Sequence, residues 1–305
     1  TPSRFPARMH RQIAKKEQAH DDSIWTVSWA AKTNLIVTGG VDEKIKVWDP
    51  EELKLKSVLG DQSLAVTSVN TSSDGKFVAS SSMDGLISVF DLTTGQNSQS
   101  ISAGTVETWT VAYSPDGNTL ATGTHSGNIN IWSVRDGKKI GESLQTGGNF
   151  TMSVAYSPDG SLLAGATHDG VVCVFDQDGQ IVHKLSGSKE AVRSLSFSPD
   201  SQTLLTGCDD KHVRLYEMKG GQQIASLSGH RSWVLSVAFC PDGQTCASSS
   251  SDKRIKIWDL KSKEALHTID AHSDQVWGVS YDGTGKKLAS VSDDASLQEF
   301  EIVLS

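Results

Sequence analysis

The sequence of 305 residues lacks several features that define common classes of protein. It has no apolar run approaching the ~20 residues of a membrane-spanning helix, and no linker rich in Pro, Ser or Gly divides it. No cluster of Lys and Arg appears at one repeat position, and the net charge is −8. Because phosphate binding requires a basic stripe, this distribution argues against a nucleic-acid groove. We therefore expect residues 1–305 to form a single domain that binds neither nucleic acid directly nor a membrane.

Features of redox, metal or catalytic chemistry are also missing. The four cysteines form no CxxC pair, which predicts reduced, buried thiols in an intracellular protein. The nine histidines have no metal-ligand spacing, and no glycine-rich phosphate loop precedes a helix. The sequence thus predicts neither an enzyme nor a bound cofactor or metal.

What the sequence does contain is one unit repeated seven times. An aromatic residue, usually followed by Asp or Glu, recurs at intervals of 41 to 43 residues. The seven positions are Trp48, Phe90, Trp132, Phe175, Tyr216, Trp258 and Phe300. This period, with Trp-Asp or Gly-His at its landmarks, resembles that of WD-repeat proteins along almost the whole chain. The resemblance implies an all-β fold, a seven-bladed propeller with one four-stranded sheet per repeat.

Each repeat also carries turn and packing signals. In the sixth repeat an alternating segment, 233–239, precedes Pro241, Asp242 and Gly243, a turn in which Pro fixes φ and Gly accepts a positive φ. Small residues share one column of the second strand and permit close approach between sheets. These are Gly39, Ser81, Gly123, Ala166, Gly207 and Ser249. We interpret the repeated Ser and Asp residues as turn and packing devices rather than catalytic groups.

The WD-repeat family carries a hydrogen-bonded chain of His, a strand hydroxyl, a turn Asp and the third-strand Trp. Its counterparts here are His20, Asp42 and Trp48 in repeat one, His230, Asp252 and Trp258 in repeat six, and His272 and Asp294 in repeat seven. The hydroxyl would come from Thr38 in repeat one and from Ser248 or Ser250 in repeat six. In repeat seven Phe300 replaces Trp, and Glu299 stands where the other repeats have Val, Ile or Leu. His, Asp and Ser resemble a catalytic triad, but their repetition at structural positions favours a scaffolding role.

The last repeat lacks a fourth strand of its own, because only residues 302–305 follow its third strand. An open sheet would leave an unpaired edge. Residues 12–17 occupy the place of a fourth strand before the first repeat, so we expect them to pair with the last sheet and close the ring. This structural role argues against a targeting function for the basic residues of the first 16 positions.

Two columns of the aligned repeats should face the mouth of the central channel, the usual partner-binding face in this family. One column contains Trp25, Thr67, Trp109, Met152, Arg193, Leu235 and Trp277. The other contains Ser23, Ala65, Glu107, Phe150, Ala191, Trp233 and Gln275. Four of the eight tryptophans fall in these columns, which matches the Trp, Tyr and Arg bias of binding hot spots. The candidate partner-binding residues are Trp25, Glu107, Trp109, Phe150, Met152, Arg193, Trp233 and Trp277; packing of the tryptophans between sheets is the alternative.

Four segments resemble the small WD-repeat subunit shared by the superkiller (Ski) complex and the polymerase-associated factor (Paf) complex. They are EQAHDDSIWTVSW (17–29), ATGTH (121–125), SGHRSWVLSVAFCPD (228–242) and HSDQVWGV (272–279). The resemblance implies a scaffold in mRNA decay or transcription elongation, in the cytoplasm and nucleus. Its partners would be a tetratricopeptide-repeat protein and an RNA helicase of the Ski complex, or subunits of the Paf complex. It would be a monomeric subunit of a hetero-oligomer and bind segments containing Gln-Arg and a hydrophobic residue.

Two other functions remain open from the sequence. A histone-tail reader would use aromatic residues and an acid such as Glu107 to bind methylated lysine. An adaptor of a ubiquitin ligase or an intraflagellar complex would use the same mouth for a different partner.

Overall fold

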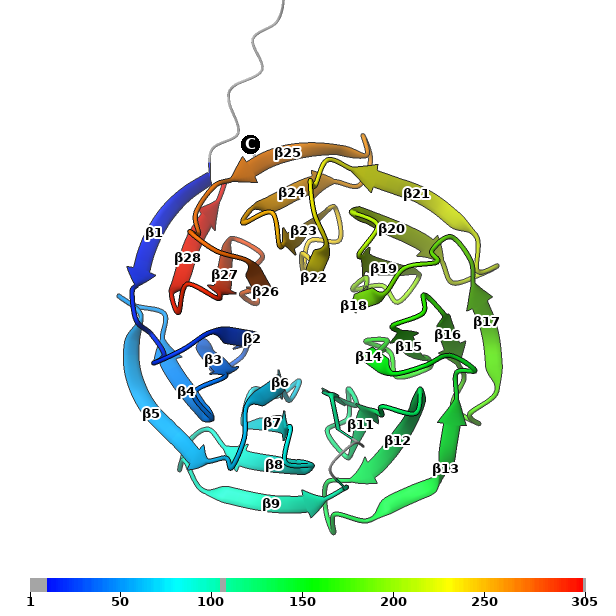
Figure 1. Cartoon of the computed structure of the whole chain (residues 1–305), viewed down its shortest axis with the longest axis horizontal. Helices are drawn as coiled ribbons and strands as arrows, with labels where there is room; N and C mark the ends of the chain where they lie inside the picture. Colours follow the sequence, from blue (N-terminus) through cyan, green and yellow to red (C-terminus); the bar gives the residue numbers. More distant parts are fainter. Residues whose placement is uncertain (1–9, 105–107, 304–305) are drawn as a thin grey trace, which may run out of the picture.

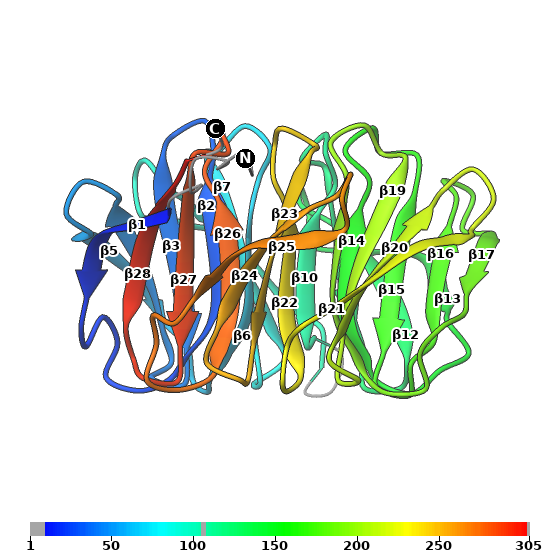
Figure 2. The same ribbon diagram turned by 90° about the horizontal axis from the view of Figure 1, so that it is seen from above.

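The computed structural model describes residues 10–104 and 108–303. Seven four-stranded antiparallel sheets, or blades, surround a central axis, with the first strand of each repeat innermost (Figure 1). All regular elements of the described residues are strands. The predicted all-β, seven-bladed propeller is therefore confirmed. Edge-on, the outer strands β21 and β25 cross the inner strands obliquely, as the twist of each sheet requires (Figure 2).

The strands fall into blades in chain order, except that β1 belongs to the last blade. Blade 1 has β2 (Ile24–Ala30), β3 (Leu35–Gly40), β4 (Lys44–Asp49) and β5 (Lys54–Asp61). Blade 2 has β6 (Val66–Thr71), β7 (Phe77–Ser82), β8 (Leu86–Asp91) and β9 (Asn97–Ser102). Blade 3 has β10 (Thr110–Tyr113), β11 (Thr119–Gly123), β12 (Asn128–Ser133) and β13 (Lys139–Gln145). Blade 4 has β14 (Thr151–Tyr156), β15 (Leu163–Thr167), β16 (Val172–Phe175) and β17 (Ile181–Leu185).

The remaining blades follow the same plan. Blade 5 has β18 (Val192–Phe197), β19 (Thr203–Cys208), β20 (His212–Glu217) and β21 (Gln223–Ser228). Blade 6 has β22 (Val234–Phe239), β23 (Thr245–Ser250), β24 (Ile255–Asp259) and β25 (Glu264–Ile269). Blade 7 has β26 (Val276–Tyr281), β27 (Lys287–Ser292), β28 (Leu297–Ile302) and β1 (His10–Lys16).

The turns between the first two strands of blades 3 and 4 have the sequence Ser-Pro-Asp-Gly, at residues 114–117 and 157–160. The Ser114 hydroxyl donates to Asp116 at 2.5 Å, and Gly117 adopts a φ of +74°. The Asp116 carboxylate also accepts the Asn118 amide at 3.0 Å. These bonds satisfy the polar groups of the turn locally, as expected for a turn signal rather than a catalytic group.

Ring closure depends on β1, which pairs antiparallel with β28 from His10 opposite Ile302 to Lys16 opposite Leu297. The predicted closing strand, residues 12–17, is therefore present but lies at residues 10–16. The strand ends at Lys16, and Gln18, two residues further on, adopts a positive φ of 48°. The first and last strands of the chain thus share one sheet, and the last blade has no open β28 edge.

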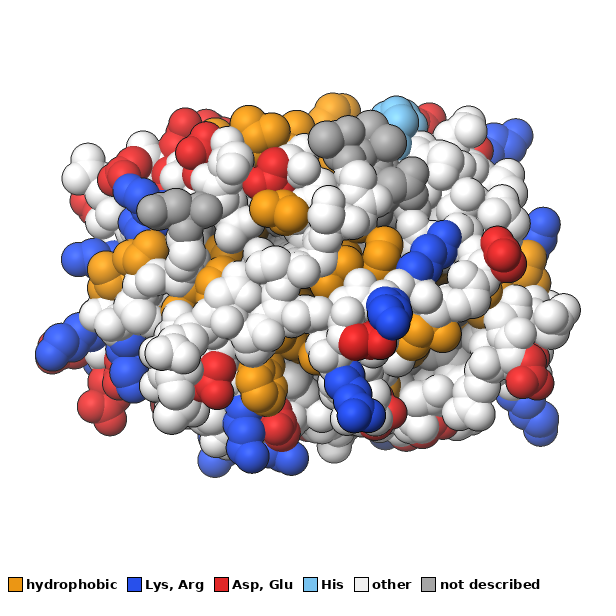
Figure 3. All heavy atoms as spheres, turned by 90° about the horizontal axis from the view of Figure 1, so that it is seen from below, with side chains coloured by type: hydrophobic (Ala, Val, Ile, Leu, Met, Phe, Trp, Pro, Cys, Tyr) orange, Lys and Arg blue, Asp and Glu red, His pale blue; other side chains and the backbone are white. Residues whose placement is uncertain are grey.

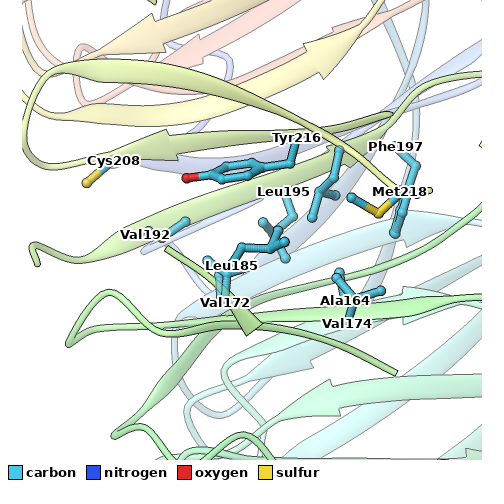
Figure 4. Close-up of a cluster of buried hydrophobic side chains, with 12 residues drawn as sticks. Ala164, Val172, Val174, Leu185, Val192, Leu195, Phe197, Cys208, Tyr216 and Met218 are labelled. Carbon is cyan, nitrogen blue, oxygen red and sulfur yellow. The ribbon is translucent and has the colours of Figure 1, made fainter. Parts of the chain in front are cut away.

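The hydrophobic core is divided among the interfaces between blades. At the interface of blades 4 and 5, Val174, Leu185 and Phe197 pack with Tyr216 and Met218 (Figure 4). Small residues of the second strand allow close packing at other interfaces too: between blades 5 and 6, a Cβ added to Gly207 would lie 2.9 Å from the Val234 side chain. Apolar burial between blades therefore holds the ring together.

Candidate partner-binding mouth

A cavity of about 200 Å³ lies in the central channel, where the innermost strands begin. Its lining includes the whole first predicted column, with one residue from each blade. These residues are Trp25, Thr67, Trp109, Met152, Arg193, Leu235 and Trp277. Repetition of the blade is what brings them together, because the same position in each repeat faces the same axis. We call this end of the channel the mouth.

Blades 1 and 7 place two tryptophans side by side at the mouth. The ring centroids of Trp25 and Trp277 are 6.0 Å apart and the planes are inclined by 46°. Trp277 Nε1 donates to Asp293 Oδ1 at 2.7 Å, and the Gln275 side-chain amide donates to Asp293 Oδ2 at 3.2 Å. Both tryptophans are partly exposed, so their faces are available while the indole N–H of Trp277 is satisfied.

Blades 5 and 6 hold an arginine against a tryptophan. Arg193 forms a bidentate pair with Asp209, at 2.5 Å from Nε and 2.8 Å from Nη2. Its guanidinium lies 4.9 Å from the centre of the Trp233 ring, a cation–π distance. Trp233 is 48% exposed, so it presents a large apolar surface at the rim. The Arg193 guanidinium is thus paired with Asp209 and also packs on Trp233.

Blades 3 and 4 supply a third aromatic cluster. Trp109 packs edge-to-face against Phe150 at 5.1 Å, and His125 lies 5.0 Å from Phe150. Met152 is buried beneath the rim. Glu107, the predicted acidic member of this region, lies outside the described residues.

A third column at the mouth was not identified from the sequence. It consists of Val41, Met83, His125, His168, Asp209, Ser251 and Asp293, each seven residues before the repeat aromatic. Backbone bonds tie it to the second predicted column, for example Asp209 N to Ala191 O and Asp293 N to Gln275 O. This column supplies the carboxylates that hold Arg193 and Trp277. Its fixed offset from the repeat aromatic is the signal that identifies it.

The hydrogen-bonded chain within the blades has the geometry that the family resemblance implies. In blade 1, His20 lies 2.7 Å from both Asp42 Oδ1 and Thr38 Oγ1, and Trp48 Nε1 donates to Thr38 at 2.8 Å.

In blade 6 the same chain joins Asp252, His230, Ser248 and Trp258, with distances of 3.0, 2.7 and 2.8 Å. Ser248 is therefore the hydroxyl, while Ser250 donates to the Ser232 carbonyl instead.

Blade 7 keeps only part of this chain. His272 lies 3.0 Å from Asp294 and 2.7 Å from Ser290, but Phe300 offers no N–H to the hydroxyl. Glu299, which stands where the other repeats have Val, Ile or Leu, is fully buried, and its Oε1 lies 2.8 Å from Lys287 Nζ. Burial raises the pKa of Glu299, although the lysine opposes that effect.

In the Asp residues of these networks hydrogen bonding outweighs the effect of burial on the pKa, whereas in His20 burial prevails. Burial would raise the pKa of Asp42, but the hydrogen bonds from His20 and from backbone amides outweigh it and lower the pKa to about 2. The same balance lowers the pKa of Asp252 to about 2. Burial lowers the pKa of His20, which favours a neutral ring that donates to Asp42 and accepts from Thr38.

The described part of the chain shows no metal-binding cluster, and its thiols are buried. Residues 10–104 and 108–303 contain no cluster of three metal-ligating side chains and no helix long and apolar enough to cross a membrane. The four cysteines are free and buried, and burial raises the pKa of the Cys240 thiol to about 11. On the flank shown in Figure 3, Lys and Arg are scattered among Asp and Glu without a continuous basic stripe.

The ring of blades and its mouth define a seven-bladed β-propeller. Five segments match the WD domain, G-beta repeat: residues 12–49, 53–91, 95–133, 221–259 and 263–299. Residues 154–234 match the anaphase-promoting complex subunit 4 WD40 domain. Because the matches cover more than half of the chain, the protein belongs to the WD-repeat family.

Several curated proteins are similar to it. The chain is 38% identical over 210 residues to WD repeat-containing protein SL1-17 of Schistosoma mansoni, covering 67% of this chain and 69% of that protein. It is 38% identical over 210 residues to WD repeat-containing protein VIP3 of Arabidopsis thaliana, covering 63% and 65%. It is 34% identical over 113 residues to Superkiller complex protein 8 of Dictyostelium discoideum, covering 36% and 37%. The chain thus spans just under two thirds of the Arabidopsis relative.

Proposed function

We propose that the protein is a non-enzymatic scaffold that docks a segment of a partner protein at the mouth. WD-repeat propellers generally act as protein-interaction scaffolds, and the mouth has the composition of a docking site. The observation that carries the proposal is the set of two aromatic pairs and one arginine–tryptophan pair around one channel, each drawn from two neighbouring blades. Truncation of a hot-spot residue in such an interface costs about 2 kcal/mol or more of binding free energy.

A cationic side chain of the partner fits this mouth. The faces of Trp25 and Trp277 are partly exposed, and Asp293 adds a carboxylate beside them. An inserted arginine would gain cation–π contact and charge pairing there. This chemistry agrees with segments containing Gln-Arg and a hydrophobic residue. The similarity to a superkiller complex protein supports membership of the Ski complex, and membership of the Paf complex rests on the sequence resemblance. The corresponding location would be the cytoplasm and the nucleus.

The test is a pull-down with purified Ski and Paf subunits. Wild type is compared with a Trp25→Ala/Trp277→Ala variant and with Leu55→Ala, a control at an apolar residue that is 44% exposed away from the mouth. Wild type and the control should retain the partner, and the double variant should lose it by at least about tenfold. Equal retention by all three folded proteins would contradict docking at the mouth.

The methyl-lysine alternative rests on the same Trp25–Trp277 pair beside a carboxylate. Peptides with trimethylated, monomethylated and unmodified lysine separate the two functions. A reader would bind the methylated forms more tightly through its aromatic faces. A scaffold that recognises arginine would instead favour an arginine-containing peptide over all three. Binding of neither class, with Ski and Paf subunits also unbound, would leave an adaptor of another assembly, such as a ubiquitin ligase or an intraflagellar complex.

A further inference from the structure

A groove of about 1350 Å³ opens on the flank of the ring between blades 3 and 4. Its walls come from β13, from the turns between the first two strands of blades 3 and 4, and from the hairpin between β16 and β17. A hollow at equivalent positions between blades 5 and 6, lined by Pro199, Leu215 and Ile224, has about 380 Å³. The repeat architecture therefore produces a shallow hollow, and something specific to blades 3 and 4 enlarges it.

One cause is a missing apolar side chain. Two residues after the repeat aromatic, the other six blades carry Pro50, Leu92, Val134, Met218, Leu260 and Ile302. Met218, for example, is buried in the core between blades 4 and 5 (Figure 4). Blade 4 has Gln177 instead, which is exposed and donates to the Gly160 carbonyl at 3.3 Å. The interface of blades 3 and 4 thus lacks the side chain that closes the others.

The second cause is an irregular outer strand. Ile129 pairs with Leu144 and Ile131 pairs with Ile140, so a two-residue step on β12 faces a four-residue step on β13. This bulge carries the exposed residues Gly141 and Glu142.

The bulge and the missing side chain together uncover part of the core. Ile131, Leu144 and Tyr156 are partly exposed. Their counterparts between blades 2 and 3, which are Val89, Ile101 and Tyr113, are all buried.

The rim of the groove is acidic. Its lining contains Asp116, Glu142, Asp159, Asp176 and Asp178, and no Lys or Arg among the described residues. Hydrogen bonds from the Ser157 hydroxyl and the Ser161 amide lower the pKa of Asp159 to about 2, so this carboxylate is charged at neutral pH. Two large apolar residues, Ile140 at 46% and Ile181 at 41% exposure, stand beside these charges.

We propose that this blade 3/4 groove is a second docking surface, which binds a basic segment of a partner protein. One or two apolar side chains of the segment pack on Ile131, Leu144 and Tyr156, and flanking Lys or Arg lie beside the carboxylates. Charge complementarity selects this occupant. A second copy of the chain fits poorly because each copy has a net charge of −8. The surface is separate from the mouth and does not depend on what binds there.

The test uses two fluorescein-labelled peptide pools of equal length, each with two fixed leucines. One pool carries flanking lysines and the other flanking glutamates, and anisotropy reports binding. The lysine pool should bind wild type at least about tenfold more tightly than the glutamate pool. Binding of the lysine pool should weaken about tenfold in Glu142→Lys/Asp178→Lys, which replaces two exposed carboxylates by positive charges. Glu51→Lys/Glu52→Lys, in the equivalent hairpin of blade 1, is the matched control and should leave binding unchanged.

Two further variants locate the binding. Gln177→Leu should fill the groove and so weaken binding of the lysine pool. It should also raise Tm by a few degrees, because it restores an apolar contact between blades. Trp25→Ala/Trp277→Ala should leave groove binding intact even if the proposed docking at the mouth fails.

Equal binding to wild type and Glu142→Lys/Asp178→Lys, or loss of binding in the mouth variant, would overturn the proposal. Sedimentation of the wild type alone provides a separate check. Self-association that disappears in Glu142→Lys/Asp178→Lys would assign the groove to a second copy and overturn it as well.

Discussion

At the scale of single residues, the strand hydroxyl of the hydrogen-bonded chain has two side-chain partners in blade 6 and one in blade 7. Ser248 contacts both His230 and Trp258, whereas Ser290 contacts His272 and faces no tryptophan N–H. Ser248→Ala should therefore orphan two buried groups and Ser290→Ala only one. Since each orphaned buried group costs ~1–3 kcal/mol, Ser248→Ala should lower the unfolding free energy by the larger amount. Urea unfolding of the two variants measures the difference, and equal losses would show that Trp258 gains nothing from Ser248.

The individual residues show where sequence reasoning succeeds. The family resemblance implied the network of His230, Asp252 and Trp258, and their spacing, which repeat one shares, supported it. The same logic brought Trp25 and Trp277 to one mouth. It did not predict that Arg193 would be paired with Asp209, because that contact depends on two side-chain rotamers rather than on the repeat.

At the scale of elements, β1 holds blade 7 together from the far end of the sequence. Deleting residues 1–17 removes the partner of β28 and leaves its edge open. We expect a lower Tm for the whole domain, because adjacent blades share their cores. A synthetic peptide of residues 10–17 should restore Tm when added in excess, by mass action on the native state. An unchanged Tm after the deletion would mean that the β1–β28 pairing contributes little to stability.

The elements also show the limit of the repeat. Strand order and the closing strand followed from the period and from the missing fourth strand of blade 7. The groove between blades 3 and 4 did not, although Gln177 and the extra residue before Phe175 are visible in the sequence. Its opening depends on how the bulge in β13 and the absent apolar side chain combine in three dimensions.

At the scale of the whole molecule, these networks make stability depend on pH. The folded pKa values of Asp42 and Asp252 are about 2, below the ordinary value of 3.8. Their contribution is thus complete above pH 3.8 and is lost as pH falls toward 2. His20 affects stability at a higher pH, because its folded pKa is lowered from 6.5. Below that pH the unfolded chain binds a proton at His20 more readily than the folded chain does, so the free energy of unfolding falls. Stability contributed by these groups should therefore fall in two stages on acidification.

Urea unfolding between pH 7 and pH 2 tests this dependence. Asp42→Asn/Asp252→Asn should be less stable than wild type at pH 7, because it loses the charge-assisted bonds to His20 and His230. It should also lose less stability than wild type between pH 4 and pH 2, since two of the carboxylates with a depressed pKa are gone. Parallel curves for the two proteins over that interval would place the acid sensitivity in other carboxylates, such as Asp159 of the turns, whose pKa is also about 2. A difference in unfolding free energy between wild type and variant that narrows toward low pH would instead identify these two blade networks as the acid-labile elements of the ring.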